Sequence, residues 1–409
     1  MWIRMTQSAL LIQPLSSAKS RASAATDERF SVLDSWRGIC ALLVALLHFP
    51  TSAALSQSAF VGSSYLFVDF FFVLSGFVIA GNYGRRLGEP RQVARFVLVR
   101  FGRLYPLHLF VLGLFVAFEI VRLLLPQLQG AGAPPPFTGE NSFGNLAINL
   151  LLLQGTGVAS QLTWNGPSWS ISSEFFAYLV FAGVVFAAGR RGWLVLCAML
   201  VAGPFVLAAY SPTNMDATYH LGLVRCLYGF SAGALLAWFL HDTLVEEKAA
   251  AAGGANRLGW TVAELCILVA IGRFVMDFGG NAGGIAAPFL FTVALYIFAH
   301  EGGLVSALLR SRFFLLLGTL SYSIYMLHIF VQGRIINVAG LVDKKFGADL
   351  VGPMVVHGTE TVGVTPDRPW LGLAAVVLML AATIIASWLT WRFVEMPAMA
   401  WFRRLAKRI

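Results

Sequence analysis

The sequence predicts an all-α polytopic membrane protein with about ten transmembrane helices, one short re-entrant segment and both termini in the cytoplasm. Of the 409 residues, 58% are hydrophobic and only 12% are charged, whereas a soluble domain usually carries about 25% charged residues. Apolar stretches recur at the length of roughly 20 residues that spans a bilayer as a helix. Basic residues are concentrated in alternate connecting segments, which is the distribution that the positive-inside rule describes.

Ten apolar stretches are long enough to cross a membrane. An eleventh, 143–157, is too short to cross easily, and we expect it to be re-entrant. In chain order, the expected spans are 37–55, 65–83, 104–125, 170–189, 193–210, 219–240, 258–276, 284–300, 313–336 and 370–393.

The distribution of positive charge sets the orientation of these spans. With the N-terminus inside, the inner segments hold 21 of the 29 Lys and Arg residues, and the outer ones hold three, all in 339–369. This arrangement places both termini in the cytoplasm. We divide the chain into an N-terminal tail (1–29), a membrane domain (30–402) and a basic C-terminal tail (403–409). The net charge of +9 therefore reflects orientation, and we expect no nucleic-acid partner.

The four cysteines indicate no further chemistry. They lie inside apolar stretches and have no paired spacing: Cys40, Cys197, Cys226 and Cys266. A disulfide framework or a zinc site would need closer or patterned cysteines. We expect no metal.

The first span carries a cation and a histidine. Arg37 and His48 are eleven residues apart, about three full helical turns, so they share one face. Because charge inside a bilayer is costly, such residues are functional candidates. Arg37 would lie near the cytoplasmic end, with the titratable imidazole deeper in. The alternative is that Arg37 pairs with Asp34 and that His48 is a hydrogen-bonded core residue.

Two carboxylates also lie at the spans. Asp69, near the outer end of the second span, could orient an imidazole or bind a sugar hydroxyl. Glu174 follows Trp169 and Ser170 at the entrance of the fourth span. An unpaired buried carboxylate is costly, so Glu174 needs a partner or a proton.

The inner loop after the second span holds six arginines and one glutamate. Arg100 and Arg103 are three residues apart, so on a helix they point the same way. Forked guanidinium groups suit a phosphorylated ligand, and coenzyme A offers a pyrophosphate and a 3′-phosphate. The alternative is that these arginines only set the topology.

Two more polar clusters follow in the second half of the chain. Ser321, Tyr325 and His328 have the spacing i, i+4, i+7 and share a helical face. At the end of the last span, Arg392 and Glu395 are spaced as a structural ion pair at i, i+3.

Taken in order, these motifs resemble those of the acyltransferase 3 family, the integral-membrane O-acyltransferases that modify surface sugars and other extracytoplasmic hydroxyls. The resemblance covers about residues 30–402. The motifs that carry it are Arg37-x10-His48, Phe71-Phe72-x-x-Ser75-Gly76-Phe77, Arg100-x-x-Arg103, Trp169-Ser170-Ile171-x-x-Glu174, Ser321-Tyr322-Ser323-x-Tyr325-x-x-His328 and Glu395-x-Pro397.

The resemblance implies the substrates and the location. Acyl-CoA, by default acetyl-CoA, would be the donor and would bind from the cytoplasm. The acceptor would be a hydroxyl of a lipid-linked or exported saccharide. The protein would lie in the bilayer of a bacterial inner membrane, with an oligomeric state that the sequence leaves open.

The residues and the resemblance together suggest a division of roles. Arg100 and Arg103 would hold the phosphates of coenzyme A, and Arg37 would either join them or stabilise oxyanion charge. His48 would act as general base on the acceptor hydroxyl. The supporting residues fall into two groups: Asp69 or Glu174 would fix the imidazole tautomer or hold the acceptor, and Trp169, Ser170, Tyr325 and His328 would contact substrate.

A non-enzymatic transporter or flippase is the alternative function, since transport sites also lie near the membrane midplane. The chain has no repeated half and no matched pair of broken helices, which argues against it. Binding of coenzyme A would distinguish the two functions, because a flippase has no reason to bind it.

Overall fold

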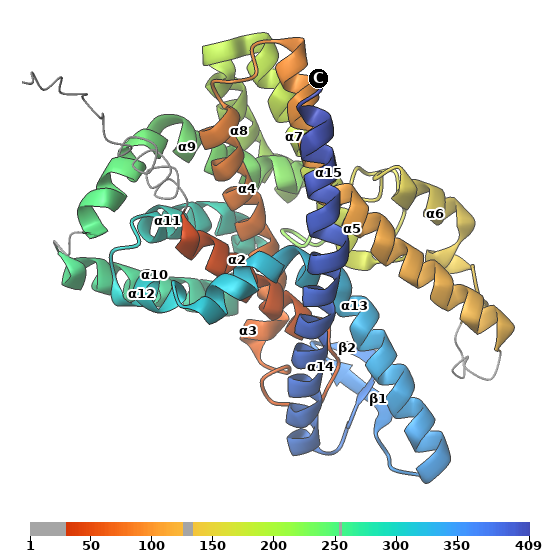
Figure 1. The fold of residues 1–409 in the computed structure, drawn as a ribbon. Helices are drawn as coiled ribbons and strands as arrows, with labels where there is room; N and C mark the ends of the chain where they lie inside the picture. Colours follow the sequence, from red (N-terminus) through yellow and green to blue (C-terminus); the bar gives the residue numbers. More distant parts are fainter. Residues whose placement is uncertain (1–29, 126–133, 253–255) are drawn as a thin grey trace, which may run out of the picture.

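The computed structural model describes residues 30–125, 134–252 and 256–409, and the described chain is a bundle of helices with one small β-hairpin (Figure 1). The expected N-terminal tail, 1–29, and part of the outer loop 126–142 lie outside these residues.

Ten long helices build the bundle in the described part of the chain. They are α2 (Ser31–Leu47), α4 (Phe67–Tyr83), α5 (Pro90–Leu124), α7 (Trp169–Ala188), α8 (Gly192–Tyr210), α9 (Gly222–Ala252), α10 (Arg257–Phe278), α11 (Ala287–Ala299), α13 (Arg312–Phe346) and α14 (Pro369–Thr390). The shorter ones are α3 (Ala59–Gly62), α6 (Phe143–Leu150), α12 (Leu304–Leu309) and α15 (Met396–Ala406), which follows α14 through a π-helical turn, Trp391–Glu395.

Eight helical stretches of the described chain are long and apolar enough to cross a membrane. One of them, Gly166–Tyr210, bends back at Gly189, which has a positive φ of 51°, and so contains both α7 and α8. The helix α2, with 17 residues, is not among the eight. An all-α membrane protein is confirmed, while ten crossings and cytoplasmic termini remain predictions.

Several helices differ in their bounds from the expected spans, and two of these differences have a local cause in the sequence. The first span was expected over 37–55, but α2 begins at Ser31 and ends at Leu47. Pro50 explains the early end, because the residue before a proline disfavours helical geometry. The third span was expected from 104, but α5 begins at Pro90 behind a capping box formed by Glu89 and Gln92; proline suits the first helical position and the box satisfies free N–H groups.

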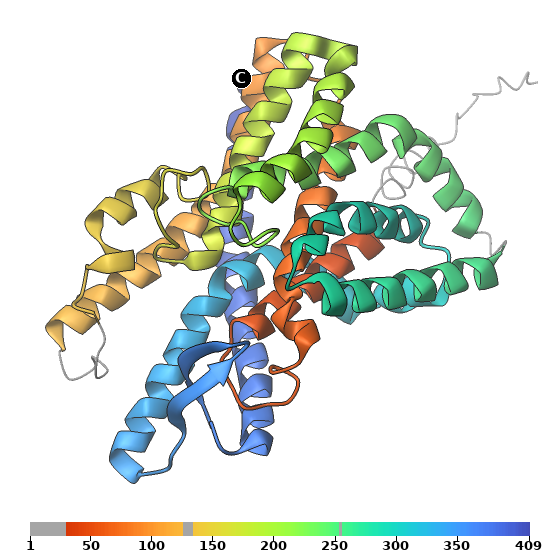
Figure 2. The ribbon, with the colours of Figure 1, turned by 180° about the vertical axis from the view of Figure 1, so that it is seen from behind.

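The expected outer segment 339–369 contains the hairpin. Strands β1 (Val351–Val356) and β2 (Thr359–Val364) are antiparallel, with Val351 opposite Val364. The turn residues His357 and Gly358 both have positive φ, as a type I′ hairpin requires. Val364 donates its N–H to the Pro50 carbonyl, so the hairpin lies against the loop that follows α2 (Figure 2).

Glycines allow the central helices to approach closely. A side chain at Gly76 would meet the Phe230 carbonyl, and one at Gly233 would meet the Val73 carbonyl, so α4 and α9 pack backbone to backbone as small residues permit in membranes. In the same way, Gly318 of α13 lies against the backbone of α2.

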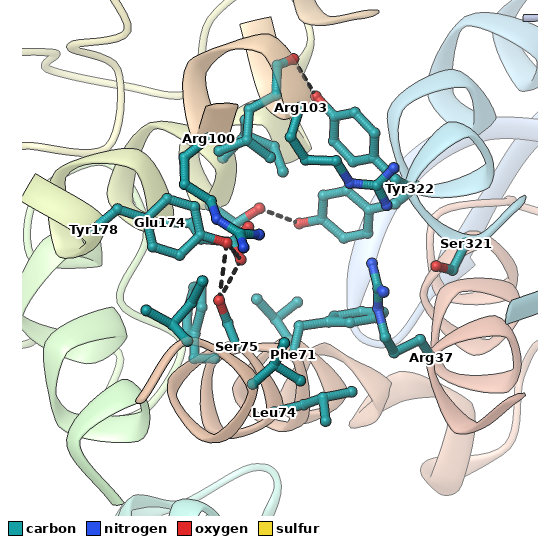
Figure 3. Close-up of a pocket in the computed structure, with 18 of the residues that line it drawn as sticks. Arg37, Phe71, Leu74, Ser75, Arg100, Arg103, Glu174, Tyr178, Ser321 and Tyr322 are labelled. Carbon is teal, nitrogen blue, oxygen red and sulfur yellow. Dashed lines mark hydrogen bonds between the residues drawn. The ribbon is translucent and has the colours of Figure 1, made fainter. Parts of the chain in front are cut away.

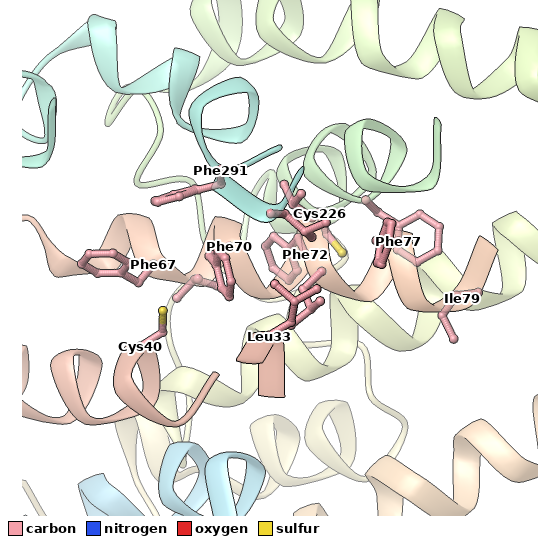
Figure 4. Close-up of a cluster of buried hydrophobic side chains, with 14 of the residues drawn as sticks. Leu33, Cys40, Phe67, Phe70, Phe72, Phe77, Ile79, Cys226 and Phe291 are labelled. Atoms are coloured by element: carbon pink, nitrogen blue, oxygen red, sulfur yellow. The ribbon is translucent and has the colours of Figure 1, made fainter. Parts of the chain in front are cut away.

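Aromatic side chains fill the space between these central helices. The largest cluster gathers on α4, where α2, α9 and α11 meet it (Figure 4). Its members include Leu33, Phe67, Phe70, Phe72, Phe77 and Phe291. This tight core fixes α2 and α4 in place.

Candidate active site

A cavity of about 150 Å³ lies among α2, α4, α5, α7 and α13 (Figure 3). It brings together residues from five of the six motifs, which are far apart in the sequence. The polar side chains on its wall are Asp34, Arg37, Ser75, Arg100, Arg103, Ser170, Glu174, Tyr178, Ser321, Tyr322 and Tyr325. Three guanidinium groups point into it from different sides, and the carboxylates of Asp34 and Glu174 share the same wall.

Arg100 is the arginine of the cavity with the freest guanidinium group. It lies over the rings of Tyr83, Phe96 and Tyr178 at 5.2, 5.8 and 5.8 Å, contacts that stabilise a cation without using its N–H donors. Its Nε is buried and has no hydrogen-bond partner in the described chain. This side chain therefore keeps donors for an anionic ligand.

Arg103 is held by a carboxylate in the π-helical turn that follows α14. It forms an ion pair with Glu395, which is 1% exposed, and lies over the Tyr322 ring at 5.5 Å. The expected pairing of Glu395 with Arg392 was wrong: Arg392 is exposed. Both belong to the π-helical turn, in which residues three apart no longer share a face, so Glu395 turns inward.

Arg37 pairs with Asp34 at 3.6 Å, as the alternative interpretation of this residue expected. Both side chains lie on the cavity wall. The pairing therefore does not remove Arg37 from the site, because both charges face the same space.

Glu174 has the partners that its burial requires. Its Oε1 accepts hydrogen bonds from Ser75 Oγ at 2.6 Å and from the Tyr178 hydroxyl at 2.5 Å. Glu174 thus lies in the arginine-lined cavity, where its charge offsets part of the positive charge.

Tyr325 lies on the wall of the cavity and is held there by hydrogen bonds. Ser170 Oγ donates to the Tyr325 hydroxyl at 2.8 Å, and that hydroxyl donates to the Pro167 carbonyl at 3.1 Å. The Tyr325 ring also lies 5.8 Å from the ring of Phe71. Trp169, in contrast, is not on the cavity wall; its ring packs on Phe72 at 6.0 Å.

His48 lies beyond Tyr325 and not on the cavity wall. It caps the C-terminus of α2, is exposed, and its Nδ1 lies 2.8 Å from the Val44 carbonyl. Its ring is 5.2 Å from that of His328, which is 5.9 Å from the ring of Tyr325. The three rings therefore form a continuous series from the cavity wall to an exposed imidazole.

Asp69 lies in a buried ion pair and not with His48. Its carboxylate accepts hydrogen bonds from Arg225 at 2.8 and 2.9 Å, and Arg225 also lies 3.7 Å from Asp216. We expected Asp69 or Glu174 to fix the tautomer of the imidazole, but neither carboxylate bonds to it. The backbone carbonyl of Val44 contacts Nδ1 instead. The sequence shows that Arg225, in an apolar span, needs a carboxylate partner, but it does not show that Asp69 is that partner.

Comparison with known proteins gives a consistent set of relatives. The acyltransferase domain family matches residues 30–392. Protein 2 in the picA locus of Rhizobium radiobacter is 36% identical over 170 residues, which cover 38% of this chain and 82% of that protein. The acyltransferase MdmB of Streptomyces mycarofaciens is 28% identical over 380 residues, which cover 87% of this chain and 83% of that protein.

A further relative is the peptidoglycan O-acetyltransferase OatA of Listeria monocytogenes. It is 22% identical over 383 residues, which cover 89% of this chain and 55% of that protein. No solved structure matches the chain. The family match includes every predicted site residue from Arg37 to His328, and these relatives favour an enzyme over a transporter.

Proposed function

This chain belongs to the acyltransferase 3 family and is an O-acyltransferase-type membrane enzyme; we propose that it moves an acyl group from cytoplasmic acyl-CoA to a hydroxyl of a lipid-linked or exported saccharide. The observation that carries the proposal is the cavity with Arg37, Arg100 and Arg103 on its wall. Acetyl-CoA is the donor that we propose, and a bacterial inner membrane is the location.

The arginines would hold the donor at its phosphates. A forked guanidinium group binds phosphate oxygens with two parallel hydrogen bonds, which are about twice as strong as neutral ones. Arg103 and Arg37 already have carboxylate partners, which offset part of their charge, so they would hold the phosphates less directly. Arg100 would make the most direct contact, because its Nε is unpartnered in the described chain.

His48 would act as the general base. Its Nδ1 faces the Val44 carbonyl, so in the neutral ring the proton is on Nδ1 and Nε2 is free to accept one. The acceptor hydroxyl would give its proton to Nε2 as its oxygen bonds to the thioester carbon. The carbon–sulfur bond then breaks, and the leaving thiolate of coenzyme A takes up the proton from the imidazolium.

The donor and the acceptor would meet at Tyr325. Because Tyr325 and His328 lie between the cavity and His48, the Tyr325 side chain must move aside for the thioester to meet a hydroxyl held at His48. Its two hydrogen bonds, to Ser170 and Pro167, would keep the passage closed when no donor is bound.

A transfer assay tests the proposal. Membranes containing the protein are incubated with radiolabelled acetyl-CoA and a crude lipid-linked glycan fraction, beside Arg100→Ala and a control, Arg85→Ala. Arg85 is exposed, pairs with Asp242 and is not on the cavity wall. We expect label in glycan with the wild type and with Arg85→Ala, and little with Arg100→Ala. Absence of both transfer and coenzyme A binding in the wild type would refute the proposal.

A further inference from the structure

His48 at the end of α2 and two side chains of α13, His328 and Gln332, share one hydrogen-bonding pattern. A ring or amide nitrogen of each faces a backbone carbonyl: His48 Nδ1 at Val44, 2.8 Å; His328 Nδ1 at Ile324, 3.3 Å; and Gln332 Nε2 at Ala45, 2.7 Å. A carbonyl oxygen only accepts, so each of these nitrogens is a donor. The other end of each neutral side chain, two Nε2 atoms and one Oε1, is then a bare acceptor.

The three side chains lie close together. The rings of His48 and His328 are 5.2 Å apart. Gln332 follows His328 by four residues, so both lie on one face of α13. Gln332 also contacts the carbonyl next to the one that His48 contacts, which places it at the same turn of α2.

Two of the three acceptors are buried without a donor. His328 is 0% exposed and Gln332 is 2% exposed, and neither His328 Nε2 nor Gln332 Oε1 has a hydrogen-bond partner in the part of the chain that the structure describes. A buried polar atom without a partner costs about 1–3 kcal/mol. Two such atoms beside an exposed imidazole suit a ligand that brings hydrogen-bond donors.

We propose that His48, His328 and Gln332 form the subsite for the acceptor alcohol, and that they select a neutral polyol with neighbouring hydroxyls. The inference rests on the proposed function and adds the chemical class of the acceptor at its reacting end. One hydroxyl bonds to His48 Nε2 and loses its proton there. A neighbouring hydroxyl donates to His328 Nε2 or Gln332 Oε1 and holds the saccharide. A phosphate or carboxylate group in this subsite would place its acceptor oxygens against the acceptor atoms of His328 and Gln332.

The subsite is tested with His328→Phe and Gln332→Leu in the purified full-length protein. Both variants remove the acceptor atom at similar volume. Transfer from radiolabelled acetyl-CoA is measured while the lipid-linked glycan fraction and acetyl-CoA are varied in turn. The control is Ser231→Ala, which removes a buried, unpartnered hydroxyl of α9 away from the cavity wall. Thermal unfolding shows whether each variant is folded.

We expect each variant to raise the half-saturating glycan concentration about tenfold, the equivalent of roughly 1.4 kcal/mol, and to leave that of acetyl-CoA unchanged. Unchanged glycan saturation in both folded variants would overturn the subsite and would mean that ordered water or packing explains these atoms. An equal change for both substrates would overturn it as well. A wild type that transfers nothing would instead refute the proposed function, and the subsite with it.

The neutral character of the acceptor has its own test with a matched pair of competitors. Ethylene glycol and glycolate are added at saturating acetyl-CoA while the glycan is varied; in glycolate a carboxylate replaces one of the two neighbouring hydroxyls. We expect ethylene glycol to compete with the glycan and glycolate to compete much less. Stronger competition by glycolate would contradict a subsite made of acceptors.

Discussion

The ring of Tyr325 lies 5.9 Å from the ring of His328, and this contact joins two parts of the molecule with different chemistry. On one side is the cavity with its arginines, and on the other is the exposed imidazole of His48. A donor held by phosphates on the first side and an acceptor held on the second would meet only at Tyr325. The proposed reaction therefore depends on this one side chain.

Replacing Tyr325 with Ala should open the cavity toward His48. Water would then reach a bound thioester, so we expect faster release of coenzyme A from acetyl-CoA without any glycan, together with slower transfer to glycan. Release is followed with a thiol reagent. Rates of both reactions equal to the wild type would show that Tyr325 is no barrier.

Replacing Arg100 with Ala should weaken coenzyme A binding. A hydrogen bond to a charged group contributes about 1.5–3 kcal/mol, so we expect the dissociation constant to rise roughly 10- to 100-fold. Calorimetry on the purified protein measures it, with Arg85→Ala as the matched control. Equal affinity in both variants would exclude Arg100 from the donor site.

Replacing Asp69 with Asn should destabilise the fold. The change leaves Arg225, 1% exposed, with only the more distant carboxylate of Asp216 at 3.7 Å, and breaking a buried pair costs about 3–5 kcal/mol. We expect a lower unfolding temperature in detergent. The double variant Asp69→Leu, Arg225→Met should recover much of it, because replacing both charges by apolar groups removes the unpaired cation.

A transfer assay distinguishes this structural role of Asp69 from the role that the sequence suggested, which was to orient an imidazole or to bind the acceptor. If Asp69 acts only through the ion pair, the folded double variant should still transfer acyl groups. Complete loss of transfer in a double variant as stable as the wild type would return Asp69 to the catalytic residues.

Much of the proposed donor site was predictable from local spacing. Arg100 and Arg103 share a helical face at any packing, and the need of Glu174 for a partner follows from its burial alone. Tyr325 was expected to share one helical face with Ser321 and His328, and its role as a substrate contact came with the family resemblance. Such features depend on one helix at a time.

The features that could not be predicted depend on how two helices meet. Asp69 pairs with Arg225 because glycines bring α4 and α9 together, and no local spacing encodes that approach. Glu395 reaches Arg103 through a π-helical turn, which shifts the side chain off its expected face. His48 lies at the end of α2 because Pro50 ends the helix early. The apolar pattern alone predicted a helix that continues beyond His48.

In the proposed mechanism, the residues that bind the donor are different from the residue that removes the proton from the acceptor. The decisive measurement is a single turnover with His48→Ala protein that has been loaded with radiolabelled acetyl-CoA and mixed with the glycan fraction. We expect the variant to bind the donor as the wild type does and to leave the glycan unlabelled. Labelled glycan formed at the wild-type rate would contradict the role of His48 as the base.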